Sequence, residues 1–416
     1  MKYFGTDGIR GIYGEGITED VAYRAGRALA YLFGGTGIVG RDTRVSGPGL
    51  EEALCAGLTD GGADAVTVGI ATTPEVAYLA RCAGAAFGVS LSASHNPPEY
   101  NGIKIFSGSG RKLSVSAEEA LEYYMENVPH RIGGGTRSSD PSAGEKYRGS
   151  LEKAASDLGA AAGGSGRLDG LRVLLDCGAG AAAPVAAEAF MRLGAAVSEL
   201  CSECRGECIN VRCGALHPSA MAAEAERRGC DIGLSFDGDA DRLVVWRRGL
   251  MAGDEVMYNL SRFFPAGSAV VGTVLSNSAL ERAVQSRGGR FVRTGVGDRS
   301  VSEVMRITGA PFGGEPSGHF VLRGGTGDGI LSGIACCILL LTGGLYSLEL
   351  DRQAAVDVPA DAGVLTSPAL TAAVEKARRL AGRVVVRMSG TEPVLRIMAE
   401  GGDAEGAAAL VAAAVK

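Results

Sequence analysis

A serine and a histidine lie together in a short loop, Leu91–Pro97, directly behind the apolar segment Phe87–Val89. Far downstream, a second loop, Asp237–Arg242, alternates three aspartates with small residues. Phosphorylation of Ser94 would add about two negative charges, and a hard cation with oxygen ligands would let that phosphate lie beside three carboxylates. The two loops together indicate phosphoryl transfer through a phosphoserine, with His95 beside it as an acid–base group. A helix cap or a turn is the alternative for the serine.

The three carboxylates, those of Asp237, Asp239 and Asp241, follow the apolar run Ile232–Phe236. Open α/β sheets bind ligands at the carboxyl ends of their strands, so this position favours a metal site. A solvated acidic turn is the alternative. An EF-hand is excluded because Arg242 stands where that loop needs its glycine. This arginine could instead pair with the phosphoryl group that is transferred.

Two further loops have the composition of binding sites. The loop Arg387–Pro393 combines two hydroxyls, a glycine and an arginine, with Arg396 close behind, as an anion-binding nest requires. A turn between strands is the alternative. The glycine-rich loop Gly313–His319 offers Glu315, whose carboxylate can accept from two adjacent sugar hydroxyls. Near the serine loop, Asn101–Lys104 adds a lysine that can neutralise phosphate.

The length and composition are those of a globular protein with several domains. The chain has 416 residues, of which 46% are hydrophobic and 21% charged, enough for about three domains. The net charge of −6 and the absence of a basic block argue against nucleic-acid binding. No signal peptide is predicted, and the apolar run Ile330–Tyr346 is too short to span a bilayer and is expected to be a buried helix. We therefore expect a cytoplasmic protein.

Four of the ten cysteines, Cys201, Cys204, Cys208 and Cys213, lie close enough in sequence to resemble a zinc or iron–sulfur site. Their spacing is irregular and lacks the paired C-x-x-C pattern of a zinc ribbon. We expect reduced thiols rather than a metal site.

Strand-like apolar segments alternate with alanine-rich helical stretches over most of the chain, which predicts an α/β fold with mainly parallel sheets. The last ~65 residues differ in their pattern of apolar and helical segments, with two predicted strands separated by a helix and a helix at the end, and this pattern predicts a smaller α+β unit. A Gly/Ala/Ser stretch, 160–166, is expected to be a linker or a surface loop. The main predicted strands are 65–68, 171–176, 269–275, 354–358 and 383–388, and the main predicted helices are 48–61, 74–83, 279–287, 367–381 and 404–415.

The motifs resemble those of the α-D-phosphohexomutases. FGTDGIRG, GRDTR, SASHNP, YNGIK, DGDADR, TGDGI and SGTEP occur in the order of that family, between Phe4 and Arg396. Within the family, KYFGTDGIRG and Ile209–His217 are most similar to the bacterial phosphoglucosamine mutases. The resemblance implies four domains around a central cleft, three similar α/β domains with mixed, mainly parallel sheets and one α+β domain. They are expected at 1–142 with the phosphoserine loop, 143–243 with the metal loop, 244–349 with the sugar loop and 350–416 with the phosphate loop.

The resemblance also implies roles for single residues. Ser94 would be the phosphoserine, and one Mg²⁺ would be held by its phosphate together with Asp237, Asp239 and Asp241. The transfer site would be lined by Ser94, His95, Lys104, Arg10 and Arg242, with Lys104 or Arg10 as the proton-transfer group. The substrate would be bound by Glu315, Ser317, His319, Arg387, Ser389, Gly390, Thr391 and Arg396.

The activity that the resemblance implies is interconversion of glucosamine 6-phosphate and glucosamine 1-phosphate, which supplies UDP-N-acetylglucosamine and cell-wall synthesis. A bisphosphorylated hexose would be both intermediate and activator. The alternatives are a phosphomannomutase/phosphoglucomutase, a non-catalytic sugar-phosphate binder, and a phosphatase with an aspartate nucleophile. The expected partner is a small phosphosugar, with no nucleic acid and no membrane, and a homodimer is allowed.

Some positions depart from the family pattern. Gly295 stands where a lysine usually faces the substrate, Pro316 replaces a glutamine, and Ala215–Leu216 replaces a Ser-Thr pair. If the missing lysine only neutralises charge, Arg293 or Arg299 could substitute for it. These departures concern substrate preference and rate rather than the phosphoserine and the metal.

Overall fold

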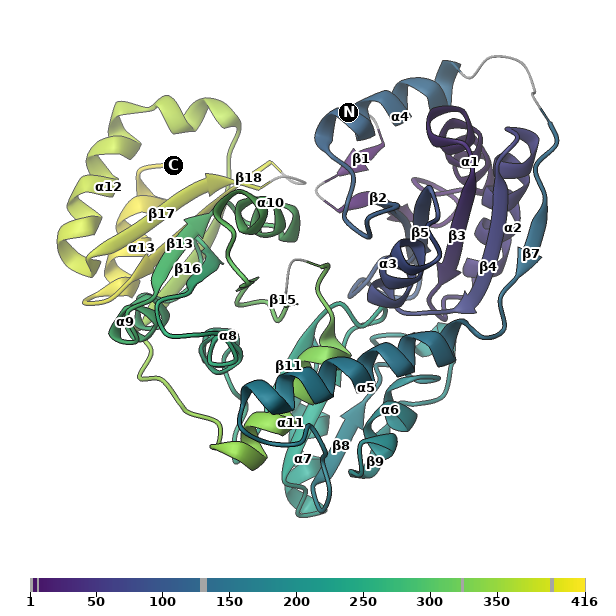
Figure 1. Ribbon diagram of the computed structural model, residues 1–416. Coiled ribbons are helices and arrows are strands. Elements are labelled where there is room, and N and C mark those ends of the chain that lie inside the picture. Colours follow the sequence, from purple (N-terminus) through teal and green to yellow (C-terminus); the bar gives the residue numbers. More distant parts are fainter. Residues whose placement is uncertain (1–2, 6, 128–132, 323–324, 390–392, 416) are drawn as a thin grey trace.

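The computed structural model describes residues 3–5, 7–127, 133–322, 325–389 and 393–415. Its strands form four sheets that follow one another along the chain, with helices packed against each of them (Figure 1). The predicted fold class, three α/β units and a smaller C-terminal α+β unit, is confirmed. The exact domain boundaries given above stay predictions.

The first sheet has seven strands in the order β1-β2-β6-β5-β3-β4-β7. Strands β5, β3, β4 and β7 are parallel, whereas β1, β2 and β6 pair antiparallel. A capping box formed by Thr72 and Glu75 starts α3. The elements are β1 (Phe4–Gly5), β2 (Gly8–Ile12), α1 (Glu19–Phe33), β3 (Thr36–Arg41), α2 (Gly47–Asp60), β4 (Asp64–Ile70), α3 (Thr73–Cys82), β5 (Phe87–Leu91), β6 (Tyr100–Ser107), α4 (Val115–Asn127) and β7 (Arg137–Ser139).

The second sheet has the order β11-β10-β8-β9, with β10, β8 and β9 parallel and β11 antiparallel. The stretch 160–166, expected to be a loop, begins with the last two residues of α5 and is otherwise irregular. The elements are α5 (Ala143–Ala161), β8 (Arg172–Asp176), α6 (Ala186–Arg192), β9 (Ala196–Leu200), a 3₁₀ turn η1 (Gly206–Cys208), α7 (Ser219–Arg227), β10 (Ile232–Phe236) and β11 (Leu243–Trp246).

The third sheet has the order β13-β12-β14-β15. The predicted buried helix is α11, which ends at Thr342, four residues earlier than the apolar run. No helix in the described part of the chain is long and apolar enough to cross a membrane. The elements are α8 (Gly253–Ser261), β12 (Ala269–Thr273), α9 (Ser278–Ser286), β13 (Arg290–Thr294), α10 (Asp298–Thr308), β14 (Phe312–Gly314), β15 (Phe320–Leu322) and α11 (Gly329–Thr342).

The fourth sheet is antiparallel, in the order β16-β18-β17, and packs against two helices. Arg383 attaches this unit to the third one, because its guanidinium donates to the carbonyls of Val274 and Ser276 (2.7 Å each). The elements are β16 (Gln353–Pro359), a 3₁₀ turn η2 (Ala362–Thr366), α12 (Pro368–Ala381), β17 (Arg383–Met388), β18 (Val394–Glu400) and α13 (Ala404–Ala413).

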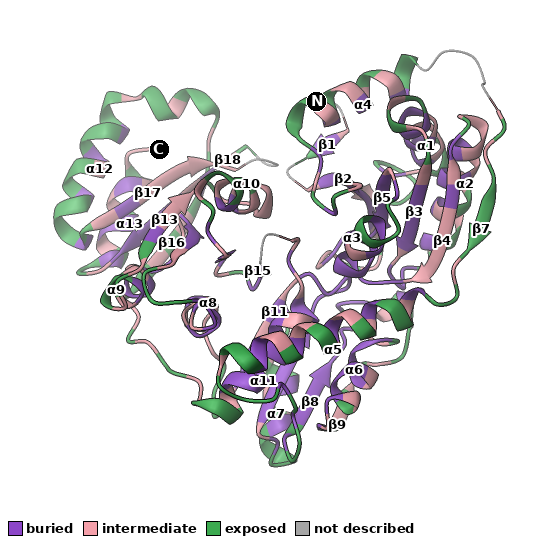
Figure 2. Cartoon of the chain, viewed as in Figure 1, coloured by how far each residue is buried: buried purple, intermediate pink, exposed green. Residues whose placement is uncertain are grey.

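One hydrophobic core runs through the second and third units. It joins Phe190 and Leu234 of the second unit to Phe312 and Ile334 of the third. The first and fourth units have cores of their own. Figure 2 shows this burial along β8 in the second unit and β3 in the first, while the outer side of α12 is exposed. The continuous core fixes the second and third units relative to each other, and the loops on their strand ends with them.

Candidate active site

The Ser94 loop follows β5, and its backbone is held by neighbours on several sides. Ser94 has a left-handed φ of 51°, a conformation that costs energy for a residue other than glycine. Its N–H donates to Ser92 Oγ (2.8 Å), and its carbonyl accepts from Arg44 Nη2 (3.0 Å) and Asn210 Nδ2 (2.8 Å). These contacts fix the buried Ser94 side chain at the end of the strand.

A fully buried ion pair between Arg44 and Asp42 organises this loop. Arg44 Nε lies 2.9 Å from Asp42 Oδ2, and neither side chain has exposed surface. Asp42 Oδ2 also accepts from the Ser92 hydroxyl (2.7 Å). The Arg44 guanidinium also donates to the carbonyl oxygens of Ser94, Asn96, Pro97 and Tyr100. One arginine therefore donates hydrogen bonds to four backbone carbonyls, so the geometry of the Ser94 loop depends on the Arg44 side chain.

The aspartate turn follows β10 and lies against the Ser94 loop. Ser94 Oγ donates to Asp237 Oδ2 at 2.5 Å. Gly238 permits this approach, because a Cβ there would lie 2.6 Å from the Ser94 carbonyl oxygen. The turn closes through the Ala240 N–H, which donates to the Asp237 carbonyl (3.0 Å). The structure thus brings together the two loops that the sequence pairs.

The three aspartates offer an oxygen donor set that fits a hard divalent cation. One carboxylate oxygen from each of Asp237, Asp239 and Asp241 lies within 4.8 Å of the other two, and all three side chains are buried. Asp239 Oδ1 and Asp241 Oδ1 have no hydrogen-bond partner among the described residues. Buried carboxylate oxygens without a partner are costly, so these atoms are suited to a metal ion. Burial and the neighbouring carboxylates raise the pKa of Asp237, a repulsion that a cation would relieve.

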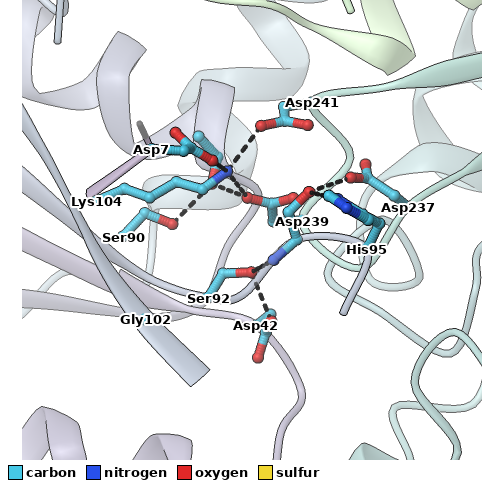
Figure 3. A network of polar contacts seen from close by, with 12 residues as sticks. Asp7, Asp42, Ser90, Ser92, His95, Gly102, Lys104, Asp237, Asp239 and Asp241 are labelled. Atoms are coloured by element: carbon cyan, nitrogen blue, oxygen red, sulfur yellow. Dashed lines mark hydrogen bonds and ion pairs between the residues drawn. The ribbon is translucent and has the colours of Figure 1, made fainter. Parts of the chain in front are cut away.

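Lys104, on β6, lies between the carboxylates of Asp7, Asp239 and Asp241 (Figure 3). Its Nζ donates to Asp239 Oδ2 and Asp241 Oδ2 (2.8 Å each) and is 3.2 Å from Asp7 Oδ2. Burial opposes its charge, but the three carboxylates outweigh burial and raise the pKa of Lys104. In this form Lys104 is an ammonium that neutralises charge, and it has no lone pair with which to accept a proton.

His95 and two arginines complete the surroundings of Ser94. His95 Nδ1 lies 3.2 Å from Ser94 Oγ. Burial, with the Arg242 and Arg10 guanidinium groups, lowers the pKa of His95 to about 3, so the imidazole is neutral. Arg10 donates to Asn96 Oδ1 (2.9 Å), and the Arg242 N–H donates to the Asp237 carboxylate (3.1 Å). The other four residues predicted for the transfer site therefore lie in one contact network with the buried Ser94 hydroxyl and Asp237.

The glycine-rich loop Gly313–His319 connects β14 to β15 and joins the aspartate turn directly. Leu243 N–H donates to the Gly318 carbonyl (3.0 Å), and Arg242 and His319 form an antiparallel bridge. A Cβ on Gly318 would lie 2.4 Å from the Leu243 carbonyl oxygen, so this contact requires glycine. The loop is thus held against the turn that carries the three aspartates.

The side chains predicted to bind the sugar hydroxyls differ in how far they are exposed to solvent. Glu315 is buried, and its Oε1 accepts from the Gly297 N–H (3.0 Å) at the start of α10. His319 is also buried, with Nε2 3.5 Å from Asp298 Oδ2. Ser317 is exposed. The structure places all three beside the aspartate turn, whereas their contacts with a sugar stay a prediction.

Two arginines of the fourth unit face each other across neighbouring strands. Arg387 on β17 pairs directly with Arg396 on β18. Burial and the facing Arg396 lower the pKa of Arg387. Like charges directly opposite each other destabilise a sheet unless an anion lies between them, so the pair is suited to a phosphate. Ser389 follows β17, whereas the predicted ligands Gly390 and Thr391 lie outside the described residues.

Several residues that hold the site were not singled out from the sequence. Besides Asp42 and Arg44, Thr73 donates to Asp239 Oδ2 (2.5 Å) from the first turn of α3. Asn210, with a left-handed φ of 59°, binds two carbonyls of the Ser94 loop. Asp7 is ion-paired with Lys104 and with Arg10. The only sequence signal for these residues was that some of them fall in loops of the family pattern.

The two arginines considered as substitutes for a lysine at Gly295 have other partners. Arg293 is paired with Glu281 (3.0 Å) and donates to two backbone carbonyls. Arg299 is ion-paired with Glu118 of the first unit. The expectation that either could substitute is therefore not supported. A Cβ at Gly295 would have Ser300 Oγ as its one neighbour within 4 Å, at 3.7 Å, so the backbone there has room for a Cβ.

Comparison with protein-family models gives four matches that together cover most of the chain. The model described as phosphoglucomutase/phosphomannomutase alpha/beta/alpha domain I matches residues 1–131, and those of domains II and III match 151–249 and 252–355. The model of the C-terminal domain of the same family matches residues 349–416.

Proteins with similar sequences or structures carry names from the same family. The phosphoglucosamine mutase of Moorella thermoacetica is 43% identical over 97% of this chain and 96% of its own, and that of Thermotoga maritima is 39% identical over the same shares. A phosphoglucomutase/phosphomannomutase family protein of Burkholderia thailandensis has a TM-score of 0.80 at 26% identity, covering 98% of this chain and 95% of its own. An Aspergillus fumigatus N-acetylphosphoglucosamine mutase, solved with GlcNAc-6P and magnesium, shares the fold (TM-score 0.61, 17% identity, 92% and 82% covered).

Proposed function

The chain belongs to the phosphoglucomutase/phosphomannomutase family, and we propose that it is a phosphoglucosamine mutase. As such it is an isomerase that interconverts glucosamine 6-phosphate and glucosamine 1-phosphate. The observation that carries the proposal is the 2.5 Å hydrogen bond from Ser94 Oγ to Asp237, inside a buried cluster of three aspartates. This pairing is what a phosphoserine beside a metal site requires.

In the proposed reaction, phosphorylated Ser94 donates its phosphoryl group to the free oxygen of the bound sugar phosphate. A bond forms between the sugar oxygen and phosphorus as the bond between phosphorus and Ser94 Oγ breaks, and the proton lost by the sugar hydroxyl is replaced on Ser94 Oγ. The products are a bisphosphorylated sugar and unmodified Ser94. After this intermediate reverses its orientation in the site, its other phosphate is transferred to Ser94. A bisphosphorylated hexose is also the expected activator, because it can phosphorylate an unmodified Ser94.

The charged residues around Ser94 serve positioning and charge neutralisation, the main requirements of phosphoryl transfer. Asp237, Asp239 and Asp241 would hold Mg²⁺, which when bound would neutralise charge on the transferring group. Lys104 is already held in its charged form by two of these aspartates. Arg10 and Arg242, which lie near His95, add two further cations to the site, whichever way the sugar is bound.

The remaining two loops fit the two ends of the substrate. Glu315, Ser317 and His319 would bind sugar hydroxyls, while Arg387 and Arg396 would hold the phosphate that is not transferred. This division suits a mutase, because the same phosphate site must accept the sugar in either orientation. The cytoplasmic location, the homodimer and the choice of Mg²⁺ among divalent cations stay predictions.

Intact-mass measurement combined with a mutase assay tests the proposal. The purified protein, after incubation with glucose 1,6-bisphosphate, should gain one phosphate, mapped by peptide sequencing to Ser94. It should then convert glucosamine 6-phosphate with a higher kcat/KM than glucose 1-phosphate or mannose 1-phosphate. A preference for either hexose phosphate would make the chain a phosphoglucomutase or phosphomannomutase. A protein without phosphate on Ser94 and without turnover would be a sugar-phosphate binder instead.

A further inference from the structure

A second cluster of possible metal ligands lies on the edge of the sheet that carries the aspartate turn. A carboxylate oxygen of Asp176 and the sulfur atoms of Cys201 and Cys213 lie within 4.8 Å of one another. Asp176 is the last residue of β8, and Cys201 follows the end of β9. These strands are parallel neighbours with Asp176 opposite Leu200, so the two ligands come to the same end of the sheet. The thiols of Cys204 and Cys208 are not part of this donor set.

The Asp176 carboxylate is buried and oriented by hydrogen bonds. Its Oδ2 accepts from the Gly214 N–H (2.7 Å) and the Ser235 hydroxyl (2.8 Å), and its Oδ1 accepts from the Gly178 N–H (3.1 Å). None of the described residues forms an ion pair with it. A buried carboxylate is costly without a compensating cation. Its three donors resemble the hydrogen bonds that orient metal-ligating carboxylates.

We infer that Asp176, Cys201 and Cys213 bind a thiophilic divalent cation of the zinc class. Bond lengths of about 2.0–2.3 Å would place the ligand atoms of a tetrahedral zinc about 3.3–3.8 Å apart, so small side-chain movements would complete the site. A water molecule would take the fourth position. Cys201 is exposed, which gives the ion a route from solvent, while Cys213 and Asp176 are buried.

Ligand chemistry separates this site from the aspartate turn. Two sulfur donors favour zinc or cadmium, whereas the all-oxygen set of Asp237, Asp239 and Asp241 favours magnesium. A disulfide between Cys201 and Cys213 is the competing use of the two thiols. It requires attack by a thiolate, which the adjacent buried carboxylate disfavours, whereas a divalent cation would offset two of the three negative charges of one carboxylate and two thiolates.

The ion would stabilise the segment between Cys201 and Cys213, which contacts the Ser94 loop through Asn210. Cys201 and Cys213 flank Asn210, whose side chain donates to the carbonyls of Ser94 (2.8 Å) and Asn96 (3.1 Å). The same segment is tied to the end of β8 through backbone bonds to Gly178 and Ala179. A cation shared by Asp176 and the two thiols would therefore fix both ends of this segment.

Cadmium is a suitable probe, because its thiolate complexes absorb in the ultraviolet and its carboxylate complexes do not. The full chain, reduced and saturated with Mg²⁺, should bind one Cd²⁺ with a sulfur-to-metal band and release about two protons, one from each thiol. Zn²⁺ should abolish the band by competition. Cys201→Ser, at an exposed position, should bind at least tenfold more weakly, while Cys82→Ser, another exposed cysteine, should bind like the wild type.

Thermal unfolding gives a second measurement that does not depend on activity. Zn²⁺ should raise the unfolding midpoint of the wild type and of Cys82→Ser, but not that of Cys201→Ser or Asp176→Asn. Equal Cd²⁺ affinity in the wild type and Cys201→Ser would overturn the inference. A wild type that shows no band, or that instead forms a Cys201–Cys213 disulfide under these reducing conditions, would overturn it as well.

Discussion

The substitution Arg44→Lys tests whether the buried arginine controls phosphoryl transfer by shaping the Ser94 loop. The Arg44 side chain makes five hydrogen bonds, one to Asp42 and four to carbonyls of the loop. Lysine keeps the charge but has only three donors, without the planar fork, so at least two of these bonds are lost. At about 1.5–3 kcal/mol for each charged hydrogen bond, the loop loses about 3 kcal/mol or more.

If that loss falls on the transfer step, kcat should decrease about 100-fold, since 1.4 kcal/mol corresponds to a factor of about ten. KM for the sugar phosphate should change little, because Arg44 has no hydrogen bond or ion pair with the described residues among those predicted to bind the sugar or the distal phosphate. The assay is steady-state turnover of glucosamine 6-phosphate with catalytic glucose 1,6-bisphosphate. Near-ultraviolet circular dichroism should be recorded alongside to confirm that the variant is folded.

Arg41→Lys is the matched control. Arg41 lies three residues earlier and is partly exposed, with Nε 3.3 Å from Glu51. Its Nη1 donates to the Asp42 carbonyl (3.4 Å), and none of its hydrogen bonds or ion pairs with described residues reaches the Ser94 loop, so kcat should stay within about twofold of the wild type. An Arg44→Lys enzyme with unchanged kcat, or with a loss expressed in KM alone, would refute the proposed role of this arginine.

Three other perturbations test the remaining parts of the site. Chelation should abolish activity. Asp239→Asn should raise the Mg²⁺ concentration for half-maximal activity at least about tenfold, because one anionic ligand becomes neutral. Full activity without metal would exclude a role for the three aspartates as a metal site. Arg387→Ala should raise KM for the sugar phosphate roughly 10–100-fold with a smaller effect on kcat, through loss of a charged hydrogen bond to the distal phosphate. Arg378→Ala, at an exposed position on α12, should leave KM unchanged. The wild type should be active despite Gly295, and Gly295→Lys should change KM less than tenfold; an inert wild type rescued by the lysine would contradict this.

Some of this architecture could be predicted because its cause is local. The run Ile232–Phe236 is mostly apolar, so it forms a buried strand, and the aspartates after it come to the sheet edge. The same reasoning applies to Ser94 after β5. The fold class and the family were predicted correctly from the motifs. The roles of the individual site residues stay predictions.

Other parts could not be predicted because their partners are distant in sequence and are backbone atoms. Asn210 and Arg44 both bind the Ser94 carbonyl from segments 116 and 50 residues away. A single asparagine or arginine in a loop usually indicates only a solvated turn. The same limit applies to the cysteines, because their spacing in the sequence did not show that a carboxylate oxygen of Asp176, on a neighbouring strand, lies within 4.8 Å of the sulfur atoms of Cys201 and Cys213.

Charge balance explains why the site gathers so many cations around Ser94. Three aspartates and a phosphoserine together carry about five negative charges, too many for one buried site without compensation. One divalent cation and the charged side chains of Lys104, Arg10 and Arg242 would supply about the same number of positive charges. Lys104 already contacts the Oδ2 atoms of Asp239 and Asp241 (2.8 Å each), which leaves the Oδ1 atoms of both, without a hydrogen-bond partner among the described residues, for a metal ion. If Ser94 carries the transferred phosphate, Lys104 would stay charged in both states of the serine, because its pKa is raised, and would offset part of the phosphate charge whenever the phosphate is present.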